Sequence, residues 1–160
     1  MQAQLSRLAT ALVCLGLAII PAMAAEREEH AHGHEAGAHK LALDHGKKWS
    51  TDAPLRQGMS AIRDVVSAEH RAIHDNRATT ATYQALARKV DEQVAYMVAN
   101  CKLVPEADAN LHAILAEIIA GSDLMKGQSK TKARDGAVKL IGALKTYPQY
   151  FDHPGWRKVE

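Results

Sequence analysis

The stretch TDAPLRQGMSAIRDVVSAEHRAIHDN, residues 51–76, decides the fold class. Thr51 and Asp52 are residue types that cap helices, and Pro54 suits a first helical turn. Apolar residues then recur at the 3.6-residue spacing of an amphipathic helix, at Leu55, Met59, Ile62, Val66 and Ile73. Asn76 is a suitable stop. We therefore predict a helix across this stretch.

Three later segments repeat the pattern. A second helix is expected from Thr79 or Thr80, with an inward stripe of Tyr83, Leu86, Val90, Val94, Met97 and Cys101. A third is expected from Pro105, with an inward stripe of Leu111, Leu115 and Ile118, widened by Ile114 and Ile119. A fourth is expected across 131–151, with Val138, Ile141, Leu144 and Tyr147 or Tyr150 inward. Gly121 and Gly127 should weaken the third helix near its end, and Pro148 should kink or end the fourth.

Four amphipathic helices with short connections predict an all-α, up-down-up-down four-helix bundle over residues 49–156, with 157–160 as a C-terminal tail. The alternative is a helical dimer in which each chain supplies one helix pair. The sequence shows no internal repeat and no credible strand pair. A hydrophobic content of 47% is ordinary for a globular domain, and a net charge of +2 does not suggest a nucleic-acid-binding protein.

The first 24 residues have the layout of a cleaved signal peptide. Arg7 supplies the positive charge, an apolar run spans 8–20, and Ala22-Met23-Ala24 offers a small-residue cleavage site. The run is too short for a membrane span, and Cys14 lies inside it without the context of a lipoprotein. We therefore expect an exported, periplasmic protein. Cys101 is then the only thiol of the mature chain, so it must be buried, bound or paired between chains.

Residues 25–48 are rich in Glu, His, Gly, Ala and Lys, and we expect them to form a disordered tail. The tail carries a compact imidazole cluster of His30, His32, His34 and His39. Such tracts chelate copper, zinc or nickel, because a flexible chain lets several rings reach one ion. The cluster is the strongest single metal-binding signal in the sequence.

The predicted topology gathers a second set of ligands at one pole of the bundle. The start of the first helix, the end of the second, the start of the third and the end of the fourth share that pole. The groups expected there are Met59, Met97, Cys101, Asp108 and His112, with His45 and His153 on the flanking segments. Thioether, thiol and imidazole ligands suit Cu(I) first, then Cu(II) or Zn(II). Cys101 and His112 are the core pair of the predicted site.

A third candidate lies at the other end of the first helix. His70 and His74 are four residues apart, so both rings lie on one helix face and can bind one ion together. The intervening Arg71-Ala72-Ile73 lacks the Glu of the H-E-x-x-H zinc-protease motif.

Two resemblances accompany these patterns. The segments LALDHGKKWSTDAPLRQGM (41–59), VANCKLVPEADANLH (98–112) and YFDHPGW (150–156) resemble a group of small exported bacterial four-helix proteins, a likeness that implies export and a helical fold. The layout is also similar to the soluble b-type cytochromes, which ligate haem with a Met early in the first helix and a His late in the fourth. Met59 matches the first ligand, but the fourth helix has no internal His, and His153 would have to fold back.

These patterns lead us to expect a periplasmic metal-binding protein that acts as a buffer, carrier or sensor. Copper is the expected metal, with zinc or nickel possible. A periplasmic helical adaptor or stress protein without a metal is the alternative, and a haem protein is the minor one. We expect no enzyme, because the sequence shows no Ser–His–Asp arrangement, phosphate loop or paired-carboxylate motif.

Overall fold

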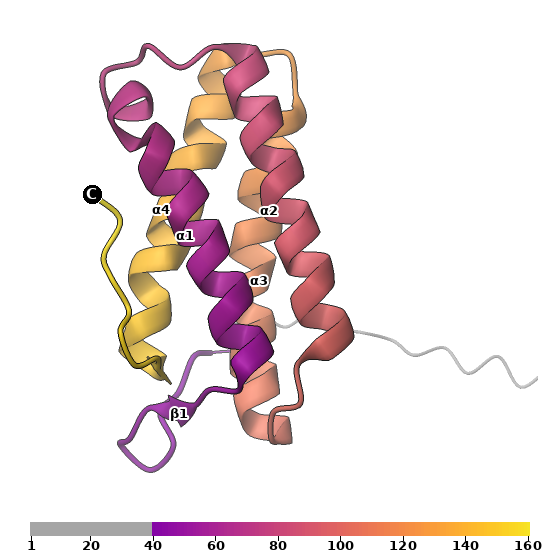
Figure 1. Cartoon of the computed structure of the whole chain (residues 1–160), viewed down its shortest axis with the longest axis vertical. Helices are drawn as coiled ribbons and strands as arrows, with labels where there is room; N and C mark the ends of the chain where they lie inside the picture. Colours follow the sequence, from indigo (N-terminus) through magenta and orange to yellow (C-terminus); the bar gives the residue numbers. More distant parts are fainter. Residues whose placement is uncertain (1–39) are drawn as a thin grey trace, which may run out of the picture. The chain divides into compact units, whose positions relative to one another are not determined.

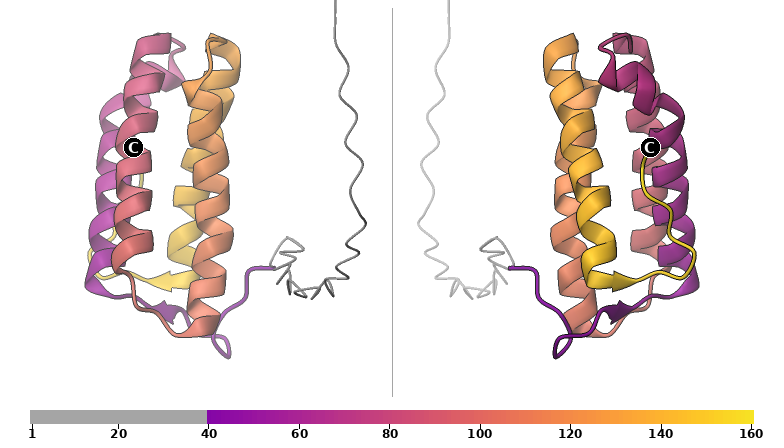
Figure 2. Two further views of the ribbon diagram at one scale, coloured as in Figure 1. Left: turned by 90° about the vertical axis from the view of Figure 1, so that its right-hand side faces the viewer. Right: turned by 90° about the vertical axis from the view of Figure 1, so that its left-hand side faces the viewer.

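The computed structural model describes residues 40–160, which form an all-α, up-down-up-down four-helix bundle (Figures 1 and 2). The helices are α1 (Ala53–His74), α2 (Thr80–Asn100), α3 (Pro105–Lys126) and α4 (Lys130–Tyr150). One chain supplies all four, so the core does not need the helix-pair dimer. No helix within the described range is long and apolar enough to cross a bilayer. The predicted signal peptide lies outside that range.

Side-chain caps set the starts of α1, α2 and α4, whereas α3 begins at Pro105 without one. The Asp52 carboxylate accepts a hydrogen bond from the Leu55 backbone N–H at 2.8 Å, and the Thr79 hydroxyl accepts one from the Thr82 N–H at 3.1 Å. Ser129 caps α4, which begins one residue earlier than predicted. Helix α4 passes through Pro148 and ends two residues later, because a proline in the last turn removes few helical hydrogen bonds.

The core follows the predicted stripes with two exceptions. Ile119 is 40% exposed and Val138 is 49% exposed, so their prediction as inward residues was wrong. The reason is the close contact between α3 and α4, where a Cβ atom on Gly121 would lie only 2.7 Å from the carbonyl oxygen of Gly136. This contact turns the small-residue face of α4 inward, with Ala133, Ala137 and Leu140 buried. Gly121 therefore serves close packing, and α3 continues beyond it.

Residues 40–48 are ordered, although we predicted them to be part of the disordered tail. The Ala42 N–H donates to the Asn110 side-chain oxygen at 2.8 Å, and the Trp49 indole donates to the Ala42 carbonyl at 2.8 Å. Asp44 and Lys47 exchange backbone hydrogen bonds across a turn. Little in the sequence indicates this order, because it depends on Asn110, 68 positions away on α3, and on bonds within the segment itself.

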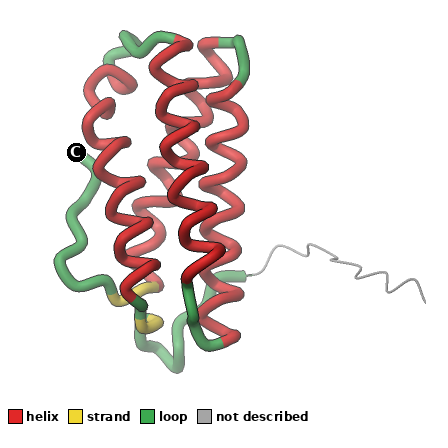
Figure 3. The backbone as a smooth tube through the Cα atoms, turned by 45° about the vertical axis from the view of Figure 1, so that its right-hand side comes forward, coloured by secondary structure: helices red, strands yellow, loops and turns green. Residues whose placement is uncertain are grey.

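A short strand pair at one end of the bundle joins the segment before α1 to the segment after α4 (Figure 3), contrary to our expectation that the chain has none. Strand β1 (Trp49–Ser50) runs parallel to β2 (Phe151–Asp152), with Trp49 opposite Phe151. The Thr51 hydroxyl also donates to the Asp152 carbonyl at 2.7 Å. Two residues per strand are too few to show an alternating pattern in the sequence.

Candidate metal-binding site

The topology brings most of the predicted pole ligands to one cavity. Met97 and Cys101 from the end of α2 and Asp108 and His112 from the start of α3 line a cavity of about 240 Å³. Its remaining wall is apolar, formed by Val98, Leu111 and Leu115. Helices α2 and α3 are consecutive and antiparallel, so the end of one meets the start of the other beside the short connection 101–104.

Hydrogen bonds orient the His112 ring. Its Nδ1 lies 2.9 Å from the Asp108 carbonyl oxygen and 3.2 Å from Oδ2 of the same residue. A carbonyl oxygen can only accept, so Nδ1 is the donor in this contact, and Nε2 is the ring nitrogen left to bind a metal. Histidines that bind metals commonly have this bracing at the second ring nitrogen. The ring is 65% exposed, which leaves Nε2 accessible to an incoming ion.

Cys101 supplies a protonated thiol at the end of α2. Burial raises its pKa to about 11, and the nearby carboxylates of Asp52 and Asp108 act in the same direction. Asp52 is held in place, because it caps α1 and also accepts the Lys102 backbone N–H at 2.7 Å. At neutral pH the thiol is therefore protonated and a poor nucleophile. Metal binding at this sulfur has to displace the proton.

The two methionines of the predicted site behave differently. Met97 is fully buried but lines the cavity, and a Cβ atom on Gly58 would lie 2.7 Å from its sulfur. Met59 is also fully buried, but it is not a wall of this cavity. We expected Met59 or Met97 to complete the ligand shell, and of the two only Met97 lines the cavity.

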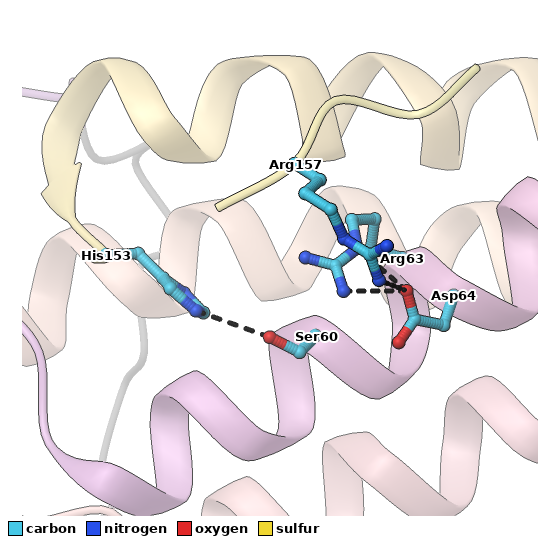
Figure 4. Close-up of polar contacts among 5 residues, drawn as sticks. All are labelled: Ser60, Arg63, Asp64, His153 and Arg157. Atoms are coloured by element: carbon cyan, nitrogen blue, oxygen red, sulfur yellow. Dashed lines mark hydrogen bonds and ion pairs between the residues drawn. The ribbon is translucent and has the colours of Figure 1, made fainter. Parts of the chain in front are cut away.

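The histidines on the flanking segments lie apart from the cavity. His45 is 97% exposed and pairs with Asp44 in the turn before β1. His153 folds back onto α1, where its Nε2 lies 3.3 Å from the Ser60 hydroxyl (Figure 4). Its Nδ1 lies 3.0 Å from the hydroxyl of Tyr147 on α4. Both ring nitrogens of His153 are therefore engaged within the protein.

The His153 arrangement does not fit haem. Tyr147, Phe151 and Trp156 stack together beside His153, with Tyr147 ring centroids 5.3 Å from Phe151 and 4.9 Å from Trp156. Met59 is fully buried, and the Ser60 and Tyr147 hydroxyls engage the two ring nitrogens of His153. Met59 and His153 therefore do not form an open pair of axial ligands.

His70 and His74 lie side by side at the opposite pole. Their ring centroids are 6.4 Å apart, and Nδ1 of His74 lies 3.0 Å from Oδ1 of Asp75. Hydrogen bonds from His74 and Arg77 hold the pKa of the Asp75 carboxyl below its usual value. The carboxyl therefore stays ionised and acts as an acceptor for the His74 ring.

The sequence reasoning missed the C-terminal strap, residues 153–160. Arg63 is only 5% exposed, and its guanidinium lies over the Trp156 ring at 5.2 Å. Arg63 and Arg157 both donate to Oδ1 of Asp64, at 2.6 and 3.2 Å (Figure 4). The strap was predicted only as a terminal turn followed by a tail. The one signal of the strap in the sequence was Arg63, an arginine on the inward face of α1.

The geometry also limits the kind of metal that fits. Within residues 40–160, no group of three or more His, Cys, Asp or Glu side chains could hold a metal ion. The imidazole cluster at 30–39 lies outside the described residues, so its chelating role stays a prediction. Comparison of the chain with protein-family models, curated proteins and solved structures finds no match, so the functional argument depends on the residues themselves.

Proposed function

We propose that the mature chain is an exported copper-binding protein that holds Cu(I) between Cys101 and His112, with Met97 as a weaker third ligand. The observation that carries this proposal is the braced His112 ring, which lines the same cavity as Cys101 and Met97 and whose Nδ1 is hydrogen-bonded, so that Nε2 is the nitrogen left to bind an ion. Such bracing has a cost in conformational freedom and is typical of a metal ligand.

The ligand set favours Cu(I) over zinc. Soft sulfur ligands select Cu(I), which accepts two or three ligands, whereas structural Zn(II) takes four. Cys101 and His112 are two ligands, and the Asp108 carboxylate on the same cavity wall is engaged with His112. No group of three or more His, Cys, Asp or Glu side chains within residues 40–160 is arranged to hold an ion, so Zn(II) would be incompletely coordinated. The thioether of Met97 adds a third soft donor.

The position of the cavity suits a buffer or carrier. His112 is exposed and Cys101 is half-buried, so a bound ion would remain accessible to a competing ligand. The raised pKa of Cys101 adds a second property, because a protonated thiol resists oxidation when no metal is bound. Both properties support reversible capture rather than permanent storage.

The test is an anaerobic Cu(I) titration of the mature chain against a competing chromogenic chelator. The four tail histidines are replaced by Ala in every variant, so that only the bundle is measured. Cys101→Ala should weaken Cu(I) binding at least about 100-fold, because the thiolate is the strongest ligand. Met97→Leu should weaken binding less, and Met59→Leu is the matched control, since it changes a buried Met outside the cavity.

Two outcomes would count against the proposal. Binding no tighter than micromolar in the parent would remove the copper function, and equal losses for Met97→Leu and Met59→Leu would remove Met97 from the site. In the first case the metal-free adaptor becomes the leading function, and it predicts that the protein copurifies with a partner in the presence of chelator.

A further inference from the structure

The distal end of α1 carries a pair of imidazoles that the Cys101 cavity does not use. His70 and His74 are one turn apart, with ring centroids at 6.4 Å and planes inclined by 35° (α1 in Figure 1). Two imidazoles bound to one ion at square-planar to tetrahedral angles have their centroids about 4.5–5.3 Å apart, given a metal–nitrogen distance of about 2.0–2.1 Å. Small side-chain rotations therefore bring both rings to one ion.

A carboxylate braces one of these rings. Nδ1 of His74 lies 3.0 Å from Oδ1 of Asp75, so the carboxylate engages this nitrogen and leaves Nε2 as the nitrogen that can bind an ion. Arg77 donates to Oδ2 of Asp75 at 2.8 Å, which fixes the carboxylate that orients the ring. The bracing resembles that of His112, and it occurs independently on another helix.

We propose that His70 and His74 form a second metal site, which binds one borderline divalent ion, Cu(II), Ni(II) or Zn(II), with water completing its coordination. Two imidazoles without sulfur suit these ions rather than Cu(I). Cys101 lies near the start of α1, where Asp52 contacts it, whereas His74 is the last residue of the helix. The 22 residues of α1 span about 33 Å, so the two sites act independently.

The test uses the mature chain with the tail histidines replaced by Ala and with Cys101→Ser, so that the other predicted sites are removed. Ni(II) and Cu(II) are titrated alone by calorimetry, and Cu(II) is also followed by electron paramagnetic resonance. The parent should bind one ion with two nitrogen donors. His70→Ala and His74→Ala should each weaken binding at least about 10-fold, and Asp75→Asn should weaken it less.

A spacing control separates chelation from the mere presence of two histidines. His74→Gln combined with Arg71→His keeps two imidazoles but places them at adjacent positions that point to different sides of the helix. Arg71 is 91% exposed, so the exchange leaves the core intact, and circular dichroism checks the fold. Binding by this control as tight as by the parent, or no parent binding beyond the single-histidine level, would overturn the proposal. Because Cys101 is absent, neither result bears on the Cu(I) site.

Discussion

Helix α4 meets its two neighbours in opposite ways. Against α3 the contact is between backbones, because Gly121 and Gly136 face each other without side chains. Against α1 the contact depends on side chains, because the C-terminal strap places Trp156 between Arg63 and Tyr147. We call the contact at Gly121 and Gly136 the glycine seam, and the contact made by Trp156 with Arg63 and Tyr147 the strap seam. The glycine seam has no room for an added atom, whereas the strap seam depends on side chains that the C-terminal strap supplies. Substitutions should therefore harm the two seams for opposite reasons.

The largest expected effect is overpacking of the glycine seam. A Cβ atom on Gly136 would lie 2.7 Å from the Leu124 Cβ and 3.1 Å from the Met125 nitrogen, so the helices must separate. We expect Gly136→Val to lower the free energy of unfolding by about 3 kcal/mol, measured by urea denaturation.

Gly142 provides the matched control, because it lies in the same helix and a Cβ atom there would meet nothing within 4 Å. Gly142→Ala should therefore stabilise the protein by up to about 1 kcal/mol, through helix propensity alone. Destabilisation of similar size at both positions would contradict the distinction between a packed and an open glycine.

The next effect concerns the strap seam. Trp156 is half-buried, and its removal eliminates the contacts with Arg63, Tyr147 and His153. We expect Trp156→Ala to cost about 2 kcal/mol of unfolding free energy, which is less than for a fully buried Trp. Arg157→Ala removes only an exposed ion pair from the same strap and should cost less than about 0.5 kcal/mol. Equal losses of unfolding free energy for Trp156→Ala and Arg157→Ala would show that the strap is held by charge rather than by its aromatic ring.

The smallest effect is a pH dependence of the strap seam. Burial lowers the pKa of His153, and the positive charges of Arg56 and Arg63 lower it further. The neutral ring is therefore favoured in the folded state, while the unfolded ring titrates near pH 6.5. The unfolded state binds more protons below that pH, so stability should fall as the pH drops from 6.5 through the folded pKa.

Because other histidines also titrate in this range, the measurement is the difference between two stability curves over pH 7.5–4.5. His153→Gln keeps a polar side chain next to Ser60 and Tyr147 but cannot titrate. The difference between parent and variant should shrink as the pH falls. A difference that is constant across the range would contradict the role of the neutral ring.

The helices could be predicted from the sequence because their signals are local. The cap at Asp52 and the start at Thr80 follow from nearby residues. Periodicity does not determine how far a helix is rotated, and so it wrongly placed Val138 inward. That rotation depends on a glycine pair contributed by two different helices.

The same difference between local signals and distant contacts decides which parts of the candidate site could be predicted. Met97, Cys101 and His112 could be grouped because consecutive helices must meet at a short connection. Met59 could not be separated from Met97, because both lie on inward stripes and only packing decides which one borders a cavity. The return of His153 to Ser60 joins residues 93 positions apart and has no local signal.

The parallel pair of β1 and β2 has a consequence for the order of assembly. The paired residues Trp49 and Phe151 are 102 positions apart in the sequence, whereas α2 and α3 follow one another with only a short connection between them. Contacts between distant positions form slowly, because a long loop has to close first. During vectorial synthesis, the first three helices can associate while Trp49 still lacks its partner. The strand pair then closes only when β2 emerges, so a chain that stops before Phe151 would retain its helices and lose this closure.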